Sequence, residues 1–384
     1  MVKYPSDWNT TTLGFLGDVK MCKRIFQSQT RPFGQIPFYK IGTFGSTPDA
    51  YISRELFKTY KNLYSFPKKG DVMISAAGTI GRTVVYDGKD AYFQDSNIVW
   101  LDIDPDKVDR NFLMYFYQSY PWENLEGTTI RRLYNGIIRN TTIHLPPLPE
   151  QKAIANTLTA FDAHIANLSE LIEKKKAIRD GALEDLVSGK MRVNNNPLEW
   201  QSLELDKIAY YSKERSTTVQ RFYVSTENMR QEFSGIDSYD STKLIQGISF
   251  SKGDILIANI RPYLKKIWYA EFEGACSADV LVLRCTENFD SKFLYYLIAN
   301  DHYINYVMAG GIKGIKMPRG DKKYIMQYPI LVPQDKKKQE KIAQMLTEMD
   351  NEITALEAER DKMISIREGA MDDLLTGRIR LKVS

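Results

Sequence analysis

The fold is decided by a stretch that the chain carries twice. It reads QKAIANTLTAFDAHIANLSELIEKKKAIRDGALEDLVSGKMRV over residues 151–193. It returns without a gap, 188 positions later, as QEKIAQMLTEMDNEITALEAERDKMISIREGAMDDLLTGRIRL over residues 339–381, and 17 of the 43 pairs are identical. A self-similar unit of this length, half a chain apart, indicates that the molecule is built as two related halves.

Both copies predict a long helix. Apolar residues recur at alternating spacings of four and three, which places them in one seam along a helix, as a coiled coil requires. The seam consists of Ile154, Leu158, Phe161, Ile165, Leu168 and Ile172 in the first copy and of Ile342, Leu346, Met349, Ile353 and Leu356 in the second. Gly189 and Gly377 predict the C-terminal ends. Because one helix cannot bury such a seam alone, we expect the two copies to pack on each other.

A mixed domain precedes each helix. In the first domain, runs rich in β-branched and aromatic residues at 71–75, 82–86 and 97–101 predict strands, and 112–118 predicts a short helix. The second domain repeats landmarks of the first, since Pro-x-[Asp/Glu]-Trp occurs at Pro5 and at Pro197, and Lys-Gly-Asp at Lys69 and at Lys252.

The predicted fold class is therefore α+β, with an internal pseudo-two-fold repeat. We place mixed α/β domains at residues 1–149 and 194–335 and helical regions at 150–193 and 336–384. At 384 residues with 43% hydrophobic composition, the chain is long enough for two domains with cores of their own.

Composition excludes several functional classes. No window approaches the 18 uncharged apolar residues of a membrane span, so we expect a cytoplasmic protein without a membrane partner. Cys22, Cys276 and Cys285 have no metal-ligand spacing and are expected to be reduced thiols. Three histidines without a nucleophile-base pattern, and no nucleotide-binding glycine loop, predict a chain with no catalytic residues, no metal and no cofactor of its own.

Charge points to local clusters. The net charge is only +4, and the domains carry 18 basic against 14 acidic residues and 17 of each, so an anionic partner must be met by particular loops. The candidate DNA-binding residues are Thr79, Arg82, Arg131, Arg132, Tyr134, Asn135 and Arg139 in the first domain, and Asn259, Arg261, Tyr263, Lys265, Lys266, Lys313, Lys316, Arg319, Lys322 and Lys323 in the second. Arginine and asparagine can bind base edges, lysine phosphate, and tyrosine sugar or base. A charge run is more often a solvated face, but these clusters fall at corresponding places in both halves.

The arrangement resembles the specificity subunit of a type I restriction-modification system, over essentially the whole chain. The resemblance is carried by the two Pro-x-[Asp/Glu]-Trp motifs, by LPPLPEQ at 145–151, and by LVSGK at 186–190 and LLTGR at 374–378. It implies two target-recognition domains separated by an antiparallel coiled coil of two long helices. The second helix departs from the pattern, because VPQD and three lysines replace the full entry segment.

The resemblance also implies function and partners. Each domain would read one half of a split sequence in double-stranded DNA, and the helices would bind two modification (methyltransferase) subunits, which bring S-adenosylmethionine. Restriction subunits are further expected partners. A helix of about 40 residues would be roughly 60 Å long, an upper limit of about 17 base-pair steps between the two reading domains. A protein-tethering scaffold without DNA readout is the competing hypothesis, and the near-neutral second domain favours it.

Overall fold

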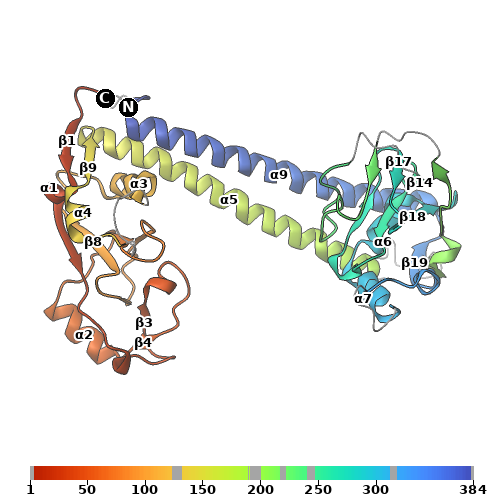
Figure 1. Cartoon of the computed structure of the whole chain (residues 1–384), viewed down its shortest axis with the longest axis horizontal. Helices are drawn as coiled ribbons and strands as arrows, with labels where there is room; N and C mark the ends of the chain where they lie inside the picture. The colour runs from red at the N-terminus through yellow and green to blue at the C-terminus, as the bar shows by residue number, and fades with distance from the viewer. Residues whose placement is uncertain are drawn as a thin grey trace. The chain divides into compact units, whose positions relative to one another are not determined.

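Two compact units make up the chain in the computed structural model, which describes residues 4–122, 132–188, 190, 200–216, 222–239, 247–311 and 318–381. Unit 1 consists of Met1–Ser169 with Ala358–Ser384, and unit 2 of Glu170–Glu357. Each unit therefore combines one mixed domain with the first half of the helix that follows it and the last half of the other helix (Figure 1).

The two long helices occur where the repeated stretch predicts them. Helix α5 spans Leu148–Val187 and α9 spans Lys336–Thr376, with 40 and 41 residues. Gly377, with φ of 72°, ends α9 as predicted, whereas Gly189 lies outside the described residues. Of the seam positions, Ile154, Leu158, Leu168, Ile172, Ile342, Leu346 and Ile353 are buried, and Phe161, Ile165, Met349 and Leu356 are half-buried.

Within each unit the helices run antiparallel. In unit 1, Arg367 lies against Asp162 at 2.9 Å, and Glu359 lies against His164 at 3.9 Å. In unit 2, the ammonium group of Lys176 is 2.7 Å from Glu357, and the guanidinium of Arg179, one turn further along α5, is 2.9 Å from Asp350. In both units, residues further along α5 contact residues that lie earlier along α9, as an antiparallel coiled coil requires.

The domain of unit 1 is built on a four-stranded antiparallel sheet. Its order is β2 (Gly17–Met21), β8 (Ile98–Ile103), β5 (Val72–Ser75) and β6 (Thr83–Val85). A smaller sheet contains β4 (Tyr51–Ile52), β3 (Ile36–Tyr39) and β7 (Tyr92–Phe93), and β1 (Asn9–Thr12) pairs with β9 (Thr142–Leu145). The helices are α1 (Leu13–Leu16), α2 (Arg54–Leu63), α3 (Arg110–Ser119) and α4 (Asn135–Asn140). The predicted strands correspond to β5, β6 and β8, and the predicted short helix to part of α3.

The domain of unit 2 repeats the main sheet of this topology. Its main sheet has the order β11 (Ala209–Tyr211), β18 (Val280–Cys285), β15 (Ile255–Ala258) and β16 (Ile267–Tyr269). The second sheet contains β12 (Arg215–Ser216), β14 (Gly247–Phe250), β17 (Gly274–Cys276) and β13 (Tyr223–Val224), and β10 (Trp200–Glu204) pairs with β19 (Pro329–Pro333). The helices are α6 (Ser291–Ile298), α7 (Asp301–Ala309) and α8 (Lys322–Ile325). The main sheet and the two-stranded pair therefore repeat their strand order, whereas the second sheet has, among the described residues, three strands in unit 1 and four in unit 2.

The repeated Lys-Gly-Asp motif builds a turn. Gly70 and Gly253 have φ of 91° and 93°, a conformation that favours glycine. The buried carboxylate of Asp71 accepts the backbone N–H of Lys68 at 2.7 Å, and that of Asp254 accepts the N–H of Ser251 at 2.7 Å. In both domains the motif therefore holds the turn that leads into the strand, β5 in unit 1 and β15 in unit 2.

The apolar seam serves two surfaces. Ile154 and Leu158 belong to the same buried cluster as Leu13 and Phe112 of the unit 1 domain. Ile342 and Leu346 lie in the corresponding cluster of unit 2. Packing of the two copies on each other is therefore only part of their burial, because the first turns of each helix also cover the core of the domain beside them.

Candidate nucleic-acid interface

The structure brings together the two predicted loops of each domain. In unit 1, the N–H of Leu133 donates to the carbonyl of Ala76 at 2.8 Å. In unit 2, the N–H of Gly320 donates to the carbonyl of Asn259 at 3.2 Å. Ala76 and Asn259 each follow the last residue of the equivalent strand, β5 or β15, so the same contact joins the loops in both domains.

An arginine precedes each of these contacts and is anchored to the turn before the equivalent strand, by a backbone carbonyl in unit 1 and by a carboxylate in unit 2. The guanidinium of Arg132 donates to the carbonyl of Ser96 at 2.8 Å. The guanidinium of Arg319 lies 3.1 Å from the carboxylate of Asp279, and its side chain is 53% exposed. Ser96 and Asp279 belong to the turns that lead into β8 and β18, so the two arginines are structural equivalents.

The remaining candidates of unit 1 are more scattered. Arg82 donates to the carbonyl of Phe44 at 3.1 Å, while Thr79, Tyr134 and Asn135 are exposed. Arg139 is not brought to the loop pair, because it lies 3.7 Å from Asp18, at the end of the sheet opposite Ser96. Arg131 lies outside the described residues.

In unit 2, two lysines are engaged within the domain. The ammonium group of Lys265 is 2.8 Å from Glu232 and 2.9 Å from Asp301, and these hydrogen bonds raise the pKa of Lys265. Lys266 donates to the carbonyl of Thr226 at 2.7 Å. The side chains of Arg261, Tyr263, Lys322 and Lys323 are exposed and Asn259 is half-buried, whereas Lys313 and Lys316 lie outside the described residues.

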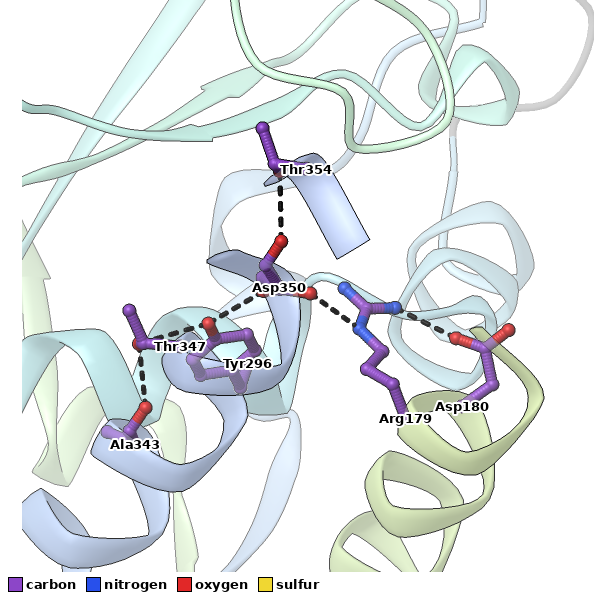
Figure 2. A network of polar contacts seen from close by, with 7 residues as sticks. All are labelled: Arg179, Asp180, Tyr296, Ala343, Thr347, Asp350 and Thr354. Atoms are coloured by element: carbon purple, nitrogen blue, oxygen red, sulfur yellow. Dashed lines mark hydrogen bonds and ion pairs between the residues drawn. The ribbon is translucent and has the colours of Figure 1, made fainter. Parts of the chain in front are cut away.

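A polar network joins the unit 2 domain to both helices (Figure 2). The hydroxyl of Tyr296, on α6, donates to the carboxylate of Asp350 at 2.8 Å and lies 3.1 Å from the hydroxyl of Thr347, both on α9. Nε of Arg179, on α5, donates to the other oxygen of Asp350 at 2.9 Å. Burial, reinforced by the charge of Asp350, raises the pKa of Tyr296. One carboxylate thus connects three elements.

The same network occurs in unit 1. The hydroxyl of Tyr115, on α3, donates to Asp162 at 2.7 Å and lies 3.2 Å from the hydroxyl of Thr159, both on α5. Nε of Arg367, on α9, donates to Asp162 at 2.9 Å. Burial raises the pKa of Tyr115 to about 12. In each unit the arginine comes from the helix of the other repeat.

A buried glutamine makes a second connection that occurs in both units. The amide oxygen of Gln151 accepts the N–H of Asp109 at 2.9 Å, and its amide nitrogen donates to the carbonyl of Pro146 at 3.0 Å. Gln339 bonds in the same way to the N–H of Asp290 at 2.9 Å and the carbonyl of Pro333 at 2.9 Å. Since both glutamines are buried, satisfying these groups fixes each domain on its helix.

Sequence reasoning missed the two tyrosines of these networks. The signal was present, because both stand in the pattern Phe-Leu-x-Tyr, at Phe112 and at Phe293. The first two residues of that pattern recur visibly, but a hydrogen bond from the fourth residue to a helix 47 or 54 positions later has no local periodicity.

The units define a class of protein, namely a scaffold of paired helices that carries two domains with similar frames and different loops. Among the described residues there is no histidine, cysteine and carboxylate group arranged to hold a metal, and no helix is long and apolar enough to span a membrane. A family model for the type I restriction modification DNA specificity domain matches residues 5–176 and again residues 197–365. The chain therefore belongs to the family of type I specificity subunits, which are non-catalytic recognition subunits.

Known relatives agree with this assignment. A protein of Haemophilus influenzae named as a type I restriction enzyme specificity subunit is 54% identical over 158 residues, which cover 41% of this chain and 41% of that relative. The MjaVIII specificity subunit of Methanocaldococcus jannaschii is 23% identical over 412 residues, covering 99% and 95% of the two chains. The crystal structure of an S subunit from M. genitalium shares the fold, with a TM-score of 0.64 and 18% identity over 100% of this chain and 99% of that one.

Proposed function

We propose that the chain reads a bipartite DNA sequence, with one half-site for each domain and an unread spacer set by the helices. The observation that carries the proposal is the pairing of two loops at the same place in both domains, each pair displaying arginine and tyrosine side chains. Arginine can donate two hydrogen bonds to a base edge, and tyrosine can pack on sugar or base. The domains share the strand order of the main sheet and their contacts with the helices but differ in these loops, as two different half-sites would require.

The helices are proposed to bind two methyltransferase subunits. Ile178 and Ile366 are equivalent positions of the repeat and are 59% and 43% exposed. Three residues later, Gly181 and Gly369 have no neighbouring atom within 4 Å of the position a Cβ would take. Glycine destabilises a helix interior, and three residues further on is the same helix face. Each unit therefore presents an exposed isoleucine next to a glycine with free space around it. Two equivalent surfaces of this kind are what two copies of one partner would need.

Those partners would supply the chemistry. S-adenosylmethionine is proposed to bind to the methyltransferase subunits, because methylation of a base inside a duplex needs a pocket for the flipped base and the family of this chain consists of non-catalytic recognition subunits. Restriction subunits would join the same complex. A chain that reads chromosomal DNA in this way would work in the cytoplasm.

Selection from random DNA tests the proposal. The chain, purified together with its methyltransferase subunit, would be incubated with a pool of random-sequence duplexes, and the bound fraction would be sequenced. We expect enrichment of two short, different elements at a fixed separation. Enrichment of no sequence would refute DNA readout and favour a tethering scaffold.

Exchange of one domain tests the division of labour. Residues 1–147 would be replaced by the corresponding domain of a related subunit, leaving α5 and α9 unchanged. We expect one half-site to change while the other half-site and the spacer remain. A change in both half-sites, or in neither, would contradict the assignment of one half-site to each domain.

A further inference from the structure

Two residues of the loop that follows β15, at residues 259–265, have an unusual backbone conformation; this loop is called the reading loop of unit 2. Strand pairing closes this loop through the N–H of Ala258 and the carbonyl of Lys266, 3.0 Å apart. The third residue of the loop, Arg261, and the last, Lys265, have φ of 50° and 53°. Glycine adopts this left-handed region readily, whereas a Cβ makes it unfavourable.

The equivalent loop of unit 1 uses glycine at both positions. It is closed by the N–H of Ser75 and the carbonyl of Arg82, 2.9 Å apart. Its third and last residues are Gly78 and Gly81, with φ of 65° and 87°. The two domains therefore share the backbone shape, and only unit 2 places side chains where that shape disfavours them.

Contacts within the unit account for Lys265. Its ammonium group is 2.8 Å from Glu232 and 2.9 Å from Asp301, and its carbonyl accepts the N–H of Phe233 at 2.9 Å. These interactions tie the loop to a neighbouring segment and to the start of α7. The strained residue is therefore retained for a side chain that holds the loop in place.

No contact within the described residues accounts for Arg261. Its side chain is exposed, and no carboxylate or carbonyl of the described chain pairs with its guanidinium. Its backbone is nevertheless held firmly, since its N–H donates to the carbonyl of Pro318 at 2.9 Å and its carbonyl accepts the N–H of Leu264 at 2.9 Å. Pro262 follows and is buried, and Tyr263 beyond it is 49% exposed. A strained residue on a rigid loop, with an outward side chain, is the arrangement found at binding sites.

We propose that Arg261 reads a guanine in the half-site recognised by unit 2. This inference rests on the proposed function and adds the residue and the base to it. Arginine makes its most specific DNA contact through two hydrogen bonds to O6 and N7 of guanine in the major groove. The rigid loop limits the positions the guanidinium can take, which favours a defined base contact over a mobile phosphate contact. Because unit 1 has Gly78 at the equivalent position, its half-site should lack this particular contact.

The experiment compares Arg261→Gly, Arg261→Ala and Lys252→Ala with the unchanged chain. Lys252 is an exposed lysine of the same domain at the opposite end of β15, so its substitution removes one positive charge without touching the loop. Each chain, in complex with its methyltransferase subunit, selects from the same pool of random duplexes. Arg261→Gly suits the left-handed backbone and should leave the thermal unfolding midpoint within a few degrees, and Arg261→Ala provides a second truncation.

The expected result is loss of preference at a single G·C pair. Both Arg261 variants should relax that position of one half-site by about tenfold or more and leave the other half-site and the spacer unchanged. Lys252→Ala should select the same sequence as the unchanged chain. Retention of every position by the Arg261 variants, or a uniform loss of affinity without relaxation of any position, would overturn the assignment. Failure of the unchanged chain to select a bipartite sequence would refute the proposed function itself.

Discussion

Replacing Asp350 by asparagine should destabilise unit 2 by removing the negative charge at the centre of the network of Figure 2. The carboxylate accepts one hydrogen bond from Arg179 at 2.9 Å and another from Tyr296 at 2.8 Å, through different oxygens. Asparagine has the same shape but only one oxygen. With that oxygen turned toward Arg179, the NH₂ group faces the hydroxyl of Tyr296, which can then accept from it and donate to Thr347. What the substitution removes is therefore the negative charge that faces the guanidinium of Arg179.

The size of the loss follows from burial. A hydrogen bond to a charged group contributes about 1.5–3 kcal/mol to the free energy of unfolding. The side chains of Arg179 and Asp350 are 27% and 34% exposed, so water compensates part of the loss. We therefore expect Asp350→Asn to destabilise unit 2 by about 2 kcal/mol, near the lower end of that range.

Asp180→Asn is the matched control. Asp180 also bonds to Arg179, at 2.9 Å, but its side chain is 67% exposed. An exposed ion pair of this kind contributes about 0–1 kcal/mol, so the same chemical change beside the same arginine should have little effect.

Urea unfolding and hydrogen exchange measure the outcome. Because the chain has two compact units, its unfolding need not be a single transition, and exchange of the α6 amides reports unit 2 directly. Exchange in α6 should accelerate in Asp350→Asn, while that in α3 of unit 1 should not. Equal effects of Asp350→Asn and Asp180→Asn, or strict additivity of Asp350→Asn with Tyr296→Phe, would refute the role assigned to the network.

Three further predictions concern glycines and thiols. Gly181→Ala and Gly369→Ala fill open space on helices, so each should raise the free energy of unfolding by about 0.5–1 kcal/mol in urea titrations. Each should also weaken capture of the methyltransferase subunit, and unchanged capture would contradict docking at this face. Gly377→Ala should lower the stability of unit 1 by about 1–3 kcal/mol, because φ of Gly377 is 72° and a Cβ there would lie 2.5 Å from the ring of Pro5. An unaltered midpoint of urea unfolding would contradict this. Burial raises the pKa of Cys22 and Cys276 to about 12, so iodoacetamide at pH 8 should alkylate them only after denaturation, as mass spectrometry can check.

The long helices could be predicted because their determinants are local or repeated. The spacing of Ile154, Leu158 and Phe161 specifies a helical seam, and recurrence at a constant offset specifies two of them. Periodicity does not say which surface covers a seam. Ile154 and Leu158 also pack on the domain core, since strands and helices from elsewhere in the sequence bring their apolar faces to the start of α5.

The sequence marks the loops after β5 and β15 as basic and polar but does not separate the roles of their residues. Arg261 and Lys265 are both basic and lie four positions apart, and nothing nearby distinguishes them. Their difference depends on Glu232, which lies 33 residues earlier and reaches Lys265 only in the folded domain. The left-handed backbone that Arg261 shares with Lys265 is likewise a feature of the folded loop, so composition alone does not distinguish a residue that holds the loop from one that points outward.

The contacts between each domain and the helices are the same in both units, whereas the loops differ. The tyrosine-to-aspartate distances are 2.7 and 2.8 Å in the two units, and both arginine-to-aspartate distances are 2.9 Å. The loop positions that share a backbone shape carry glycine in one domain and charged residues in the other. Each domain contacts the helices through α3 or α6, and the proposed readout uses the loops after β5 or β15. These loops can therefore diverge without disturbing the contacts with the helices. A substitution at Asp350 should therefore alter stability, whereas one at Arg261 should alter the sequence that is read.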